Sequence, residues 1–350
     1  MKLFTLGPVE MYPETLKTEG TQLPYFRDEA FSETMKRCEA LFLESVNAPD
    51  GASFAALTCS GTGGMDAAVQ NVLDKKDKVL VINGGSFGQR FADICRTYEI
   101  PVDTYDIPFG EAFCEKEFEK YAGKGYTALL VNLCETGTGQ KYDPVYLGRF
   151  CEDNDMIFII DAVSAYLADS IDMKSCGADV LITASQKALA LSPGASFIVL
   201  SERARERISG KKPSYYFDLN KYIEDQKRGQ PPFTSAVGIM LALRGRLEGI
   251  MQTGIDGTVK LHEERALFFR EKMKDLPVII PAYPLSNCCT PLIFPGKNAE
   301  EIYIKLRDRY GLVLTPSGGE LKTTMLRAGH LGNITPDDLD HLSECLKKEI

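Results

Sequence analysis

The sequence predicts an α/β protein of three layers, in which a mostly parallel β-sheet lies between helices, followed by a smaller α+β domain. Two observations support this fold class. Short strand-like runs alternate with helix-like segments from about residue 54 to residue 201, the pattern of repeated β-α-β units. The runs are nearly continuous in Val, Ile and Leu, as expected of strands covered by helices on both faces.

The elements of this first part follow in order along the chain. The runs with strand character are "KVLVING" (78–84), "TALLVNLCE" (127–135), "MIFIIDAV" (156–163), "ADVLITAS" (178–185) and "ASFIVLS" (195–201). Helices are expected at 63–73 and 87–98, each directly after a Gly- or Ser-rich turn. These helices would connect the strands and cover the sheet.

The order of predicted elements changes from about residue 254, where the regular alternation of strand and helix ends. The expected elements there are a long polar helix (257–276), two Pro-bounded strands, a helix (299–311), a strand (323–329) and a final helix. The final helix has a clear start, with Thr335 as N-cap, Pro336 in the first helical position, and Asp337 and Asp338 in the first turn. This region is predicted to form the smaller α+β domain.

Composition limits the classes of function. Hydrophobic residues make up 44% of the chain and charged residues 25%, the balance of a globular protein. The net charge of -9 disfavours binding to nucleic acid or to anionic membranes. No apolar run approaches membrane-spanning length, and the N-terminus lacks the apolar core of a signal peptide. We therefore expect a cytoplasmic protein.

The cysteines and histidines do not have the spacing typical of disulfide-rich or metal-binding proteins. None of the ten cysteines forms a CxxC pair, and several lie in apolar runs, which is typical of reduced, buried thiols. The three histidines lack metal-ligand spacing. No metal site is expected.

Two charged residues follow neighbouring strand-like runs. In parallel sheets ligands bind beyond the carboxyl ends of the strands, where Asp161 and Lys187 are expected. Lys187 stands among Ala and Leu in "TASQKALALSPG"; taken alone, it fits a surface lysine with its stem on apolar side chains better than a catalyst. The pair, however, suits pyridoxal phosphate (PLP): the lysine forms a Schiff base with the aldehyde, and the aspartate keeps the pyridine nitrogen protonated.

A small-residue turn offers a phosphate site. Ser60, Gly61 and Thr62 lead directly into an apolar helix, whose first N–H groups suit a phosphate. The same turn could be a tight connection between strand and helix. Its glycine spacing does not match the dinucleotide motif GxGxxG, which weakens a dinucleotide site.

With these motifs in place, nearly the whole chain resembles the class V aminotransferases of PLP fold type I. It is most similar to the alanine–glyoxylate, serine–pyruvate and 2-aminoethylphosphonate–pyruvate transaminases. The matching segments, in family order, are "LGPVEMYP" (6–13), "FRDEAFSE" (26–33), "SGTGGMDA" (60–67), "NGGSFGQR" (83–90), "ETGTG" (135–139), "DAVSAYLAD" (161–169), "SQKALALSPG" (185–194) and "LRAGHLG" (326–332).

The resemblance implies roles around the cofactor ring. Lys187 corresponds to the Schiff-base lysine and Asp161 to the partner of the pyridine nitrogen. Phe87 corresponds to the aromatic residue stacked on the ring, although without the resemblance it would be taken for a core residue. Val163 corresponds to the residue on the opposite ring face, and Thr136 to the hydroxyl beside the 3-oxygen.

Further roles implied by the resemblance concern the phosphate. Gly61 and Thr62 correspond to the phosphate-binding amides, with Ser60 beside them, and Gln186 to the polar neighbour of the lysine that contacts the phosphate. Thr234 corresponds to a residue that reaches the phosphate from a partner subunit, which implies a homodimer with the active site at the subunit interface. Thr234 fits equally well as the N-cap of the next helix.

The substrate contact implied by the resemblance is Arg327, which corresponds to the arginine that holds the acid group. A guanidinium binds a carboxylate or phosphonate through two parallel hydrogen bonds. His330 lies three residues further on and is expected to have a structural role, with the substrate pocket as the alternative.

The expected activity is a ping-pong transamination. A small amino acid or aminophosphonate would donate the amino group, and a small 2-oxo acid, pyruvate or glyoxylate, would accept it. One alternative is a PLP-dependent lyase such as a cysteine desulfurase, but such enzymes usually carry His where this chain has Phe87 and Gln186. An alternative of another class is a nonenzymatic nucleotide-binding or regulatory protein.

The resemblance also implies the division of the chain. We expect an N-terminal segment lining the active site (1–19), a large PLP-binding domain (20–253) and a small C-terminal domain (254–350).

Overall fold

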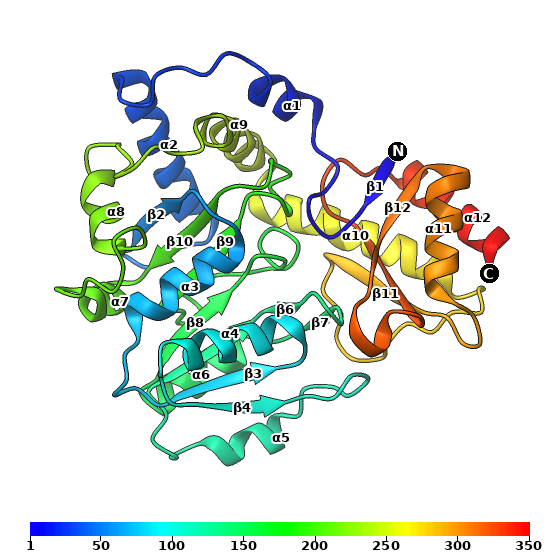
Figure 1. The fold of residues 1–350 in the computed structure, drawn as a ribbon, viewed down its shortest axis with the longest axis horizontal. Helices are drawn as coiled ribbons and strands as arrows, with labels where there is room; N and C mark the ends of the chain where they lie inside the picture. The colour runs from blue at the N-terminus through cyan, green and yellow to red at the C-terminus, as the bar shows by residue number, and fades with distance from the viewer.

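A seven-stranded sheet forms the centre of the larger part of the molecule (Figure 1). The computed structural model describes residues 1–350. In spatial order the strands are β2 (Ser53–Leu57), β10 (Ser196–Leu200), β9 (Val180–Ala184), β8 (Ile157–Asp161), β5 (Ala128–Asn132), β3 (Val79–Asn83) and β4 (Val102–Asp106). Neighbours from β9 to β4 run parallel, whereas β10 is antiparallel to both β9 and β2. The sheet is therefore mostly parallel, as predicted.

Helices cover both faces of this sheet. One face packs against α3 (Gly61–Val72), α4 (Ser86–Thr97), α7 (Glu202–Ile208) and α8 (Leu219–Gln226), and the other against α2 (Glu29–Ser45), α6 (Pro144–Asp153) and α9 (Val237–Thr253). Successive strand residues enter opposite cores: Ile157 and Ile159 lie in one, Phe158 and Ile160 in the other. The apolar runs are continuous because both sides of each strand are buried.

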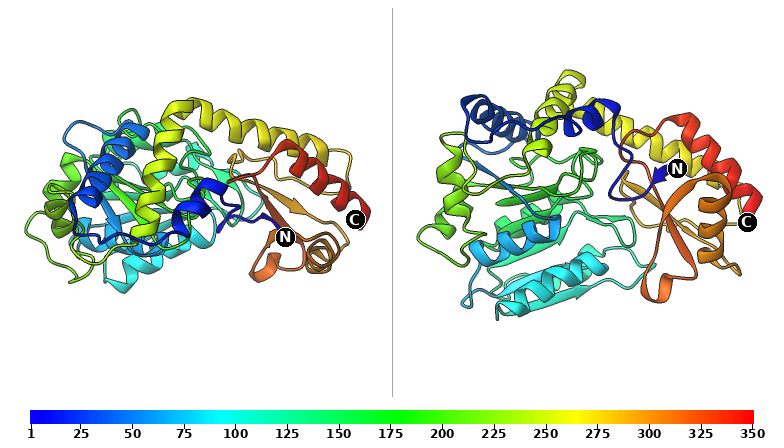
Figure 2. Two further views of the ribbon diagram at one scale, coloured as in Figure 1. Left: turned by 90° about the horizontal axis from the view of Figure 1, so that it is seen from above. Right: turned by 45° about the horizontal axis from the view of Figure 1, so that its top comes forward.

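A second, four-stranded sheet forms the smaller part. Its order is β1 (Lys2–Phe4), β12 (Leu312–Pro316), β13 (Met325–Gly329) and β11 (Cys289–Ile293). It packs with α10 (Ile255–Met273), α11 (Ala299–Tyr310) and α12 (Pro336–Glu349). Both views of Figure 2 show the N-terminal strand beside elements from the end of the chain.

The predicted elements are largely present, with some differences. The five predicted strands and the helices at 63–73 and 87–98 match β3, β5 with β6, β8, β9, β10, α3 and α4. The start of α12 is also confirmed, because Thr335 and Asp338 form a reciprocal capping box with Pro336 between them. The first of the two Pro-bounded strands is wrong: that segment makes only an isolated bridge at Ile279.

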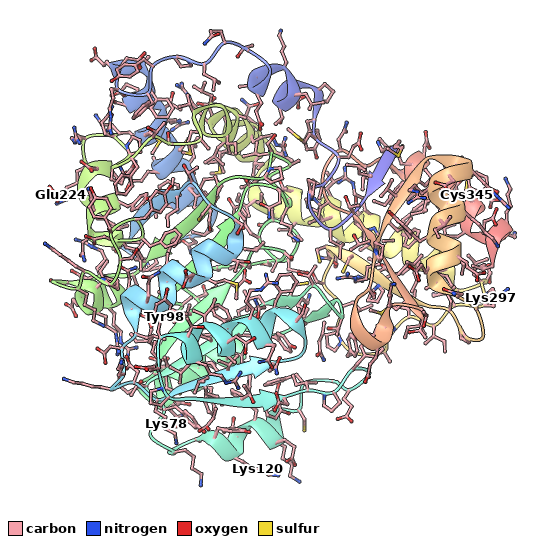
Figure 3. All side chains as sticks on the ribbon, in the orientation of Figure 1. Lys78, Tyr98, Lys120, Glu224, Lys297 and Cys345 are labelled. Atoms are coloured by element: carbon pink, nitrogen blue, oxygen red, sulfur yellow. The ribbon has the colours of Figure 1, made fainter.

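The remaining elements are short and connect the larger ones. They are α1 (Pro13–Glu19), α5 (Glu115–Phe118), β6 (Cys134–Glu135), β7 (Gln140–Lys141) and the 3-10 turns Glu119–Tyr121 and Gly319–Leu321. Figure 3 shows Lys120, Glu224 and Lys297 at the outer surface, where most charged side chains lie. No helix in the structure has the length and apolar character needed to cross a membrane.

Candidate active site

Asp161 lies at the carboxyl end of β8, in register with Asn132 at the end of β5. The amide of Asn132 donates to Asp161 Oδ2, and the N–H of Val163 donates to Asp161 Oδ1 at 2.8 Å. Burial raises the pKa of Asp161, while these two hydrogen bonds and the charges of Lys187 and Arg90 lower it. The carboxylate is thus held rigidly in a place that favours a cationic partner.

Lys187 follows the neighbouring strand β9 and is only 9% exposed. Burial lowers its pKa, and the charge of Asp161 opposes that shift. The N-terminal loop closes over this side chain, since a Cβ atom on Gly7 would lie 3.0 Å from Lys187 Cδ and Cε. The charges of Asp161 and Lys187 therefore act on each other from the ends of neighbouring strands.

The turn before α3 adjoins these residues. Ser60 caps the helix by accepting a hydrogen bond from the N–H of Gly63 at 3.4 Å. Gly61 packs against Val163, because a Cβ atom on Gly61 would lie 3.0 Å from Val163 Cγ2. Only glycine allows so close an approach between the helix N-terminus and the segment after β8.

Arg90 joins two further predicted residues. Its Nη1 donates to the hydroxyl of Thr62 at 2.8 Å, and its guanidinium lies 4.5 Å from the centre of the Phe87 ring. The hydroxyl of Thr62 and the ring of Phe87 are therefore held by a single side chain. The sequence reasoning missed Arg90, although it lies within the family segment "NGGSFGQR".

Glu135 ends a predicted strand-like run, but its role was not predicted. This buried carboxylate accepts from the N–H groups of Phe87 and Gly88, both at 3.0 Å, and from that of Gly137 at 2.9 Å. Burial raises its pKa, and the three N–H groups oppose the shift. Glu135 fixes the first turn of α4 against the segment that follows β6.

Thr136 and Arg327 meet across the two parts of the molecule. The carbonyl of Thr136 accepts from Arg327 Nη1 at 2.8 Å, and the carbonyl of Pro316 accepts from Nη2 at 2.7 Å. The Thr136 hydroxyl lies 2.6 Å from that of Ser164. Arg327 Nε is buried without a hydrogen-bond partner, so the arginine retains a donor for an anion.

A cavity of about 660 Å³ opens beside Arg327, within the size range of small-molecule sites. Its walls include the segments 83–86, 106–109, 137–138 and 317–319. A cavity of about 740 Å³ lies elsewhere, lined by residues such as Arg149 and Glu206, and contains none of the predicted site residues. The first cavity contains one of the predicted site residues, Arg327, whereas Asp161 and Lys187 do not line it.

Two of the residues considered lie away from these contacts. Thr234 is exposed, and its alternative role as an N-cap is wrong, because α9 begins after Ala236 without a side-chain cap. His330 is fully buried, with Nε2 2.8 Å from the Thr290 hydroxyl and its ring tilted on Phe269. These contacts place His330 in the packing of the smaller part of the molecule.

The residues present fit PLP. A buried amine and a buried carboxylate act on each other's pKa, and a helix N-terminus with small residues adjoins the segment after β8. Gln186 Oε1 and Asn132 Oδ1 are buried there without hydrogen-bond partners. Fold and site together define an enzyme built around pyridoxal phosphate.

Comparison with known proteins identifies the family. The model of the family described as aminotransferase class-V matches residues 17–294, and the chain belongs to this family. It is a PLP-dependent aminotransferase, as predicted. The nonenzymatic alternative is thereby set aside.

Individual relatives are similar over most of the chain. The "soluble hydrogenase, small subunit" of Synechococcus sp. is 30% identical over 293 residues, covering 81% of this chain and 76% of that protein. The L-aspartate–glyoxylate aminotransferase of Paracoccus denitrificans is 27% identical, covering 79% and 72%. A solved subgroup IV aspartate aminotransferase of Thermus thermophilus has a TM-score of 0.93 and 26% identity, covering 100% of this chain and 99% of that one.

Proposed function

We propose that this enzyme transfers an amino group from a small amino acid or aminophosphonate to pyruvate or glyoxylate by a ping-pong mechanism. The observation that carries the proposal is the placement of Asp161 and Lys187, at the ends of adjacent strands, in one buried environment. Two relatives support the substrate range: one is an L-aspartate–glyoxylate aminotransferase and another a 2-aminoethylphosphonate–pyruvate transaminase.

Lys187 is the proposed proton carrier. When bound, PLP supplies an aldehyde and an electron-withdrawing ring that labilise bonds at the amino carbon. Because burial lowers the pKa of Lys187, more of the amine is unprotonated and able to accept a proton from that carbon. The carboxylate of Asp161 would hold a proton on the nitrogen of the cofactor ring.

The anionic groups are bound by separate parts of the chain. We propose that the N–H groups of Gly61 and Thr62, with the hydroxyl of Ser60 and the amide of Gln186, hold the cofactor phosphate. The Phe87 ring and Val163 would enclose the cofactor ring, and the Thr136 hydroxyl would contact its 3-oxygen. The ordered first turn of α3 supports the phosphate assignment.

Arg327 is proposed to bind the acid group of both substrates. Its guanidinium plane is fixed by the carbonyls of Thr136 and Pro316, while Nε remains free. A fixed guanidinium loses little freedom when an anion binds, which favours a bidentate contact.

We also propose a cytoplasmic homodimer. The exposed hydroxyl of Thr234 would reach the phosphate bound by the partner subunit. Light scattering on purified protein tests the oligomeric state, and a monomer with full activity would contradict the shared site.

The proposed function is tested with purified holoenzyme and a panel of amino donors. Alanine, serine, aspartate and 2-aminoethylphosphonate are each added without an acceptor, and the visible absorbance of bound PLP is followed. A productive donor should change this absorbance, and pyruvate or glyoxylate should restore it. Lys187→Ala should abolish the cycle, because it lacks the amine. Failure of every donor in such a panel would refute the proposal.

A further inference from the structure

Three buried cysteines gather where the two parts of the molecule meet. Cys134 lies in β6, Cys289 begins β11, and Cys288 directly precedes it. Their exposed fractions are 3%, 0% and 0%, and the sulfur atoms of Cys134 and Cys288 are 3.3 Å apart. The proposed transamination uses none of these thiols.

Backbone connections link these three cysteines to active-site residues in both parts of the molecule. Cys134 directly precedes Glu135 and Thr136, whereas Cys289 pairs with Gly329 on the strand that carries Arg327. The carbonyl of Cys288 also accepts from the N–H of His330 at 3.0 Å. A covalent bond between Cys134 and Cys288 would therefore join the large and small domains beside Arg327.

The two thiols are chemically unequal. Hydrogen bonds from Cys134 and Cys289, together with the charge of Lys187, lower the pKa of Cys288. The pKa of Cys134 is raised, first by its hydrogen bond to Cys288 and then by burial. Ionisation of Cys288 leaves Cys134 as the hydrogen-bond donor between sulfur atoms 3.3 Å apart, and thiolates are the form that reacts with peroxides.

We propose that Cys134 and Cys288 form a peroxide-sensitive dithiol, a modification site that closes reversibly to a disulfide. The Cys288 thiolate attacks one oxygen of hydrogen peroxide, the O–O bond breaks, and after protonation the products are a sulfenic acid and water. The sulfur of Cys134 then attacks the Cys288 sulfur, a second water leaves, and the S–S bond forms. Two thiols are oxidised and one peroxide is reduced to two waters.

Closure changes the geometry near the substrate arginine. The sulfur atoms must approach from 3.3 Å to about 2.0 Å, and the bond then ties β6 to the residue that precedes β11. The Thr136 carbonyl that fixes Arg327 follows β6 directly. The disulfide is expected to raise KM for the acid substrates several-fold, and a thiol reductant should restore the original value.

Formation of the Cys134–Cys288 disulfide does not depend on the proposed function and can be tested separately. Holoenzyme is treated with hydrogen peroxide, quenched with an alkylating agent, digested and analysed by mass spectrometry. The expected product is a peptide pair linked through Cys134 and Cys288, which dithiothreitol separates. Absence of this linked pair from peroxide-treated wild-type protein overturns the proposal, whatever the activity results are.

Matched variants identify the partners. Cys289→Ser should retain the link, because Cys288 is unchanged, and Cys288→Ser should lose it. Cys114→Ser removes an exposed thiol and should also retain the link. If the linked peptide pair forms in Cys288→Ser but not in Cys289→Ser, the partner of Cys134 is Cys289. This result would refute the proposed pair.

Discussion

Asp161 ends β8 and Lys187 follows the neighbouring parallel strand β9, and the charge of each shifts the pKa of the other. Burial acts on both groups against their charged forms. Each charge therefore partly offsets the cost of burying the other. A ligand with a cationic nitrogen and an electrophilic carbon can exploit both residues at once.

Asp161→Asn should weaken PLP binding by about 100-fold, or about 3 kcal/mol, because a buried ion pair loses one partner. The fold should persist, since an amide oxygen can still accept from the N–H of Val163. Asn132 Oδ1, which has no partner, can accept from the new amide. Fluorescence titration with PLP measures the affinity. Asp93→Asn on the exposed face of α4 is the control, and equal affinities of the two variants would contradict the role of Asp161.

Glu135→Ala should lower the free energy of unfolding by about 2 to 3 kcal/mol, because backbone N–H groups at Phe87, Gly88 and Gly137 lose their acceptor. PLP affinity should fall as well, since Phe87 loses its anchor. Urea unfolding and PLP titration measure the two effects. Glu135→Gln retains one oxygen acceptor and should lie between wild type and Glu135→Ala. A stability equal to wild type in Glu135→Ala would contradict the prediction.

Arg327→Lys should raise KM for the acid substrates by about 10- to 100-fold, or roughly 1.4 to 2.8 kcal/mol, with a smaller change in kcat. Lysine keeps the charge but loses the planar fork that the Thr136 and Pro316 carbonyls orient. Steady-state kinetics measure both constants. Arg309→Lys, at an exposed ion pair with Glu349, is the control. An unchanged KM in Arg327→Lys would show that the acid group binds elsewhere.

Acid should destabilise the protein partly through His262. Burial lowers the pKa of this histidine to about 4, while its Nδ1 hydrogen-bonds the carbonyls of Leu167 and Thr258. Between about pH 6.5 and pH 4 the unfolded chain binds a proton there that the folded chain does not, so stability is complete above this window and falls as pH drops through it. The expected loss from this residue is about 3 kcal/mol.

Denaturant unfolding at several pH values checks this expectation. His262→Asn should have a shallower dependence between pH 6.5 and pH 4 than wild type, because the titrating ring is gone. His341→Asn changes an exposed histidine and should keep the wild-type dependence. Parallel curves for wild type and His262→Asn would exclude His262 as the source.

The strands that carry Asp161 and Lys187 were predictable from the sequence because both are continuous apolar runs, and such runs identify buried parallel strands from local composition alone. Other strands were not predicted. β1 is short and pairs with β12, more than 300 residues away, so no local pattern reveals the partner. The Pro-bounded segment near Ile279 contributes only a bridge, since proline cannot donate to a strand ladder.

The same contrast between local and long-range signals applies to the candidate site. Residue type and position at strand ends pointed to Asp161 and Lys187, and the family segments pointed to the surrounding residues. The contacts of Glu135 could not be foreseen, because its partners are backbone N–H groups, one of them 48 positions earlier in the chain. Every residue except proline has a backbone N–H group, so residue identity does not show which of these groups will donate to Glu135.

Because Gly7 lies against Lys187 and the strand just before it pairs with Leu312–Leu314, the covering of the lysine depends on segments that are far apart in the sequence. Loosening the pairing of β1 with β12 would therefore uncover the amine from a distance.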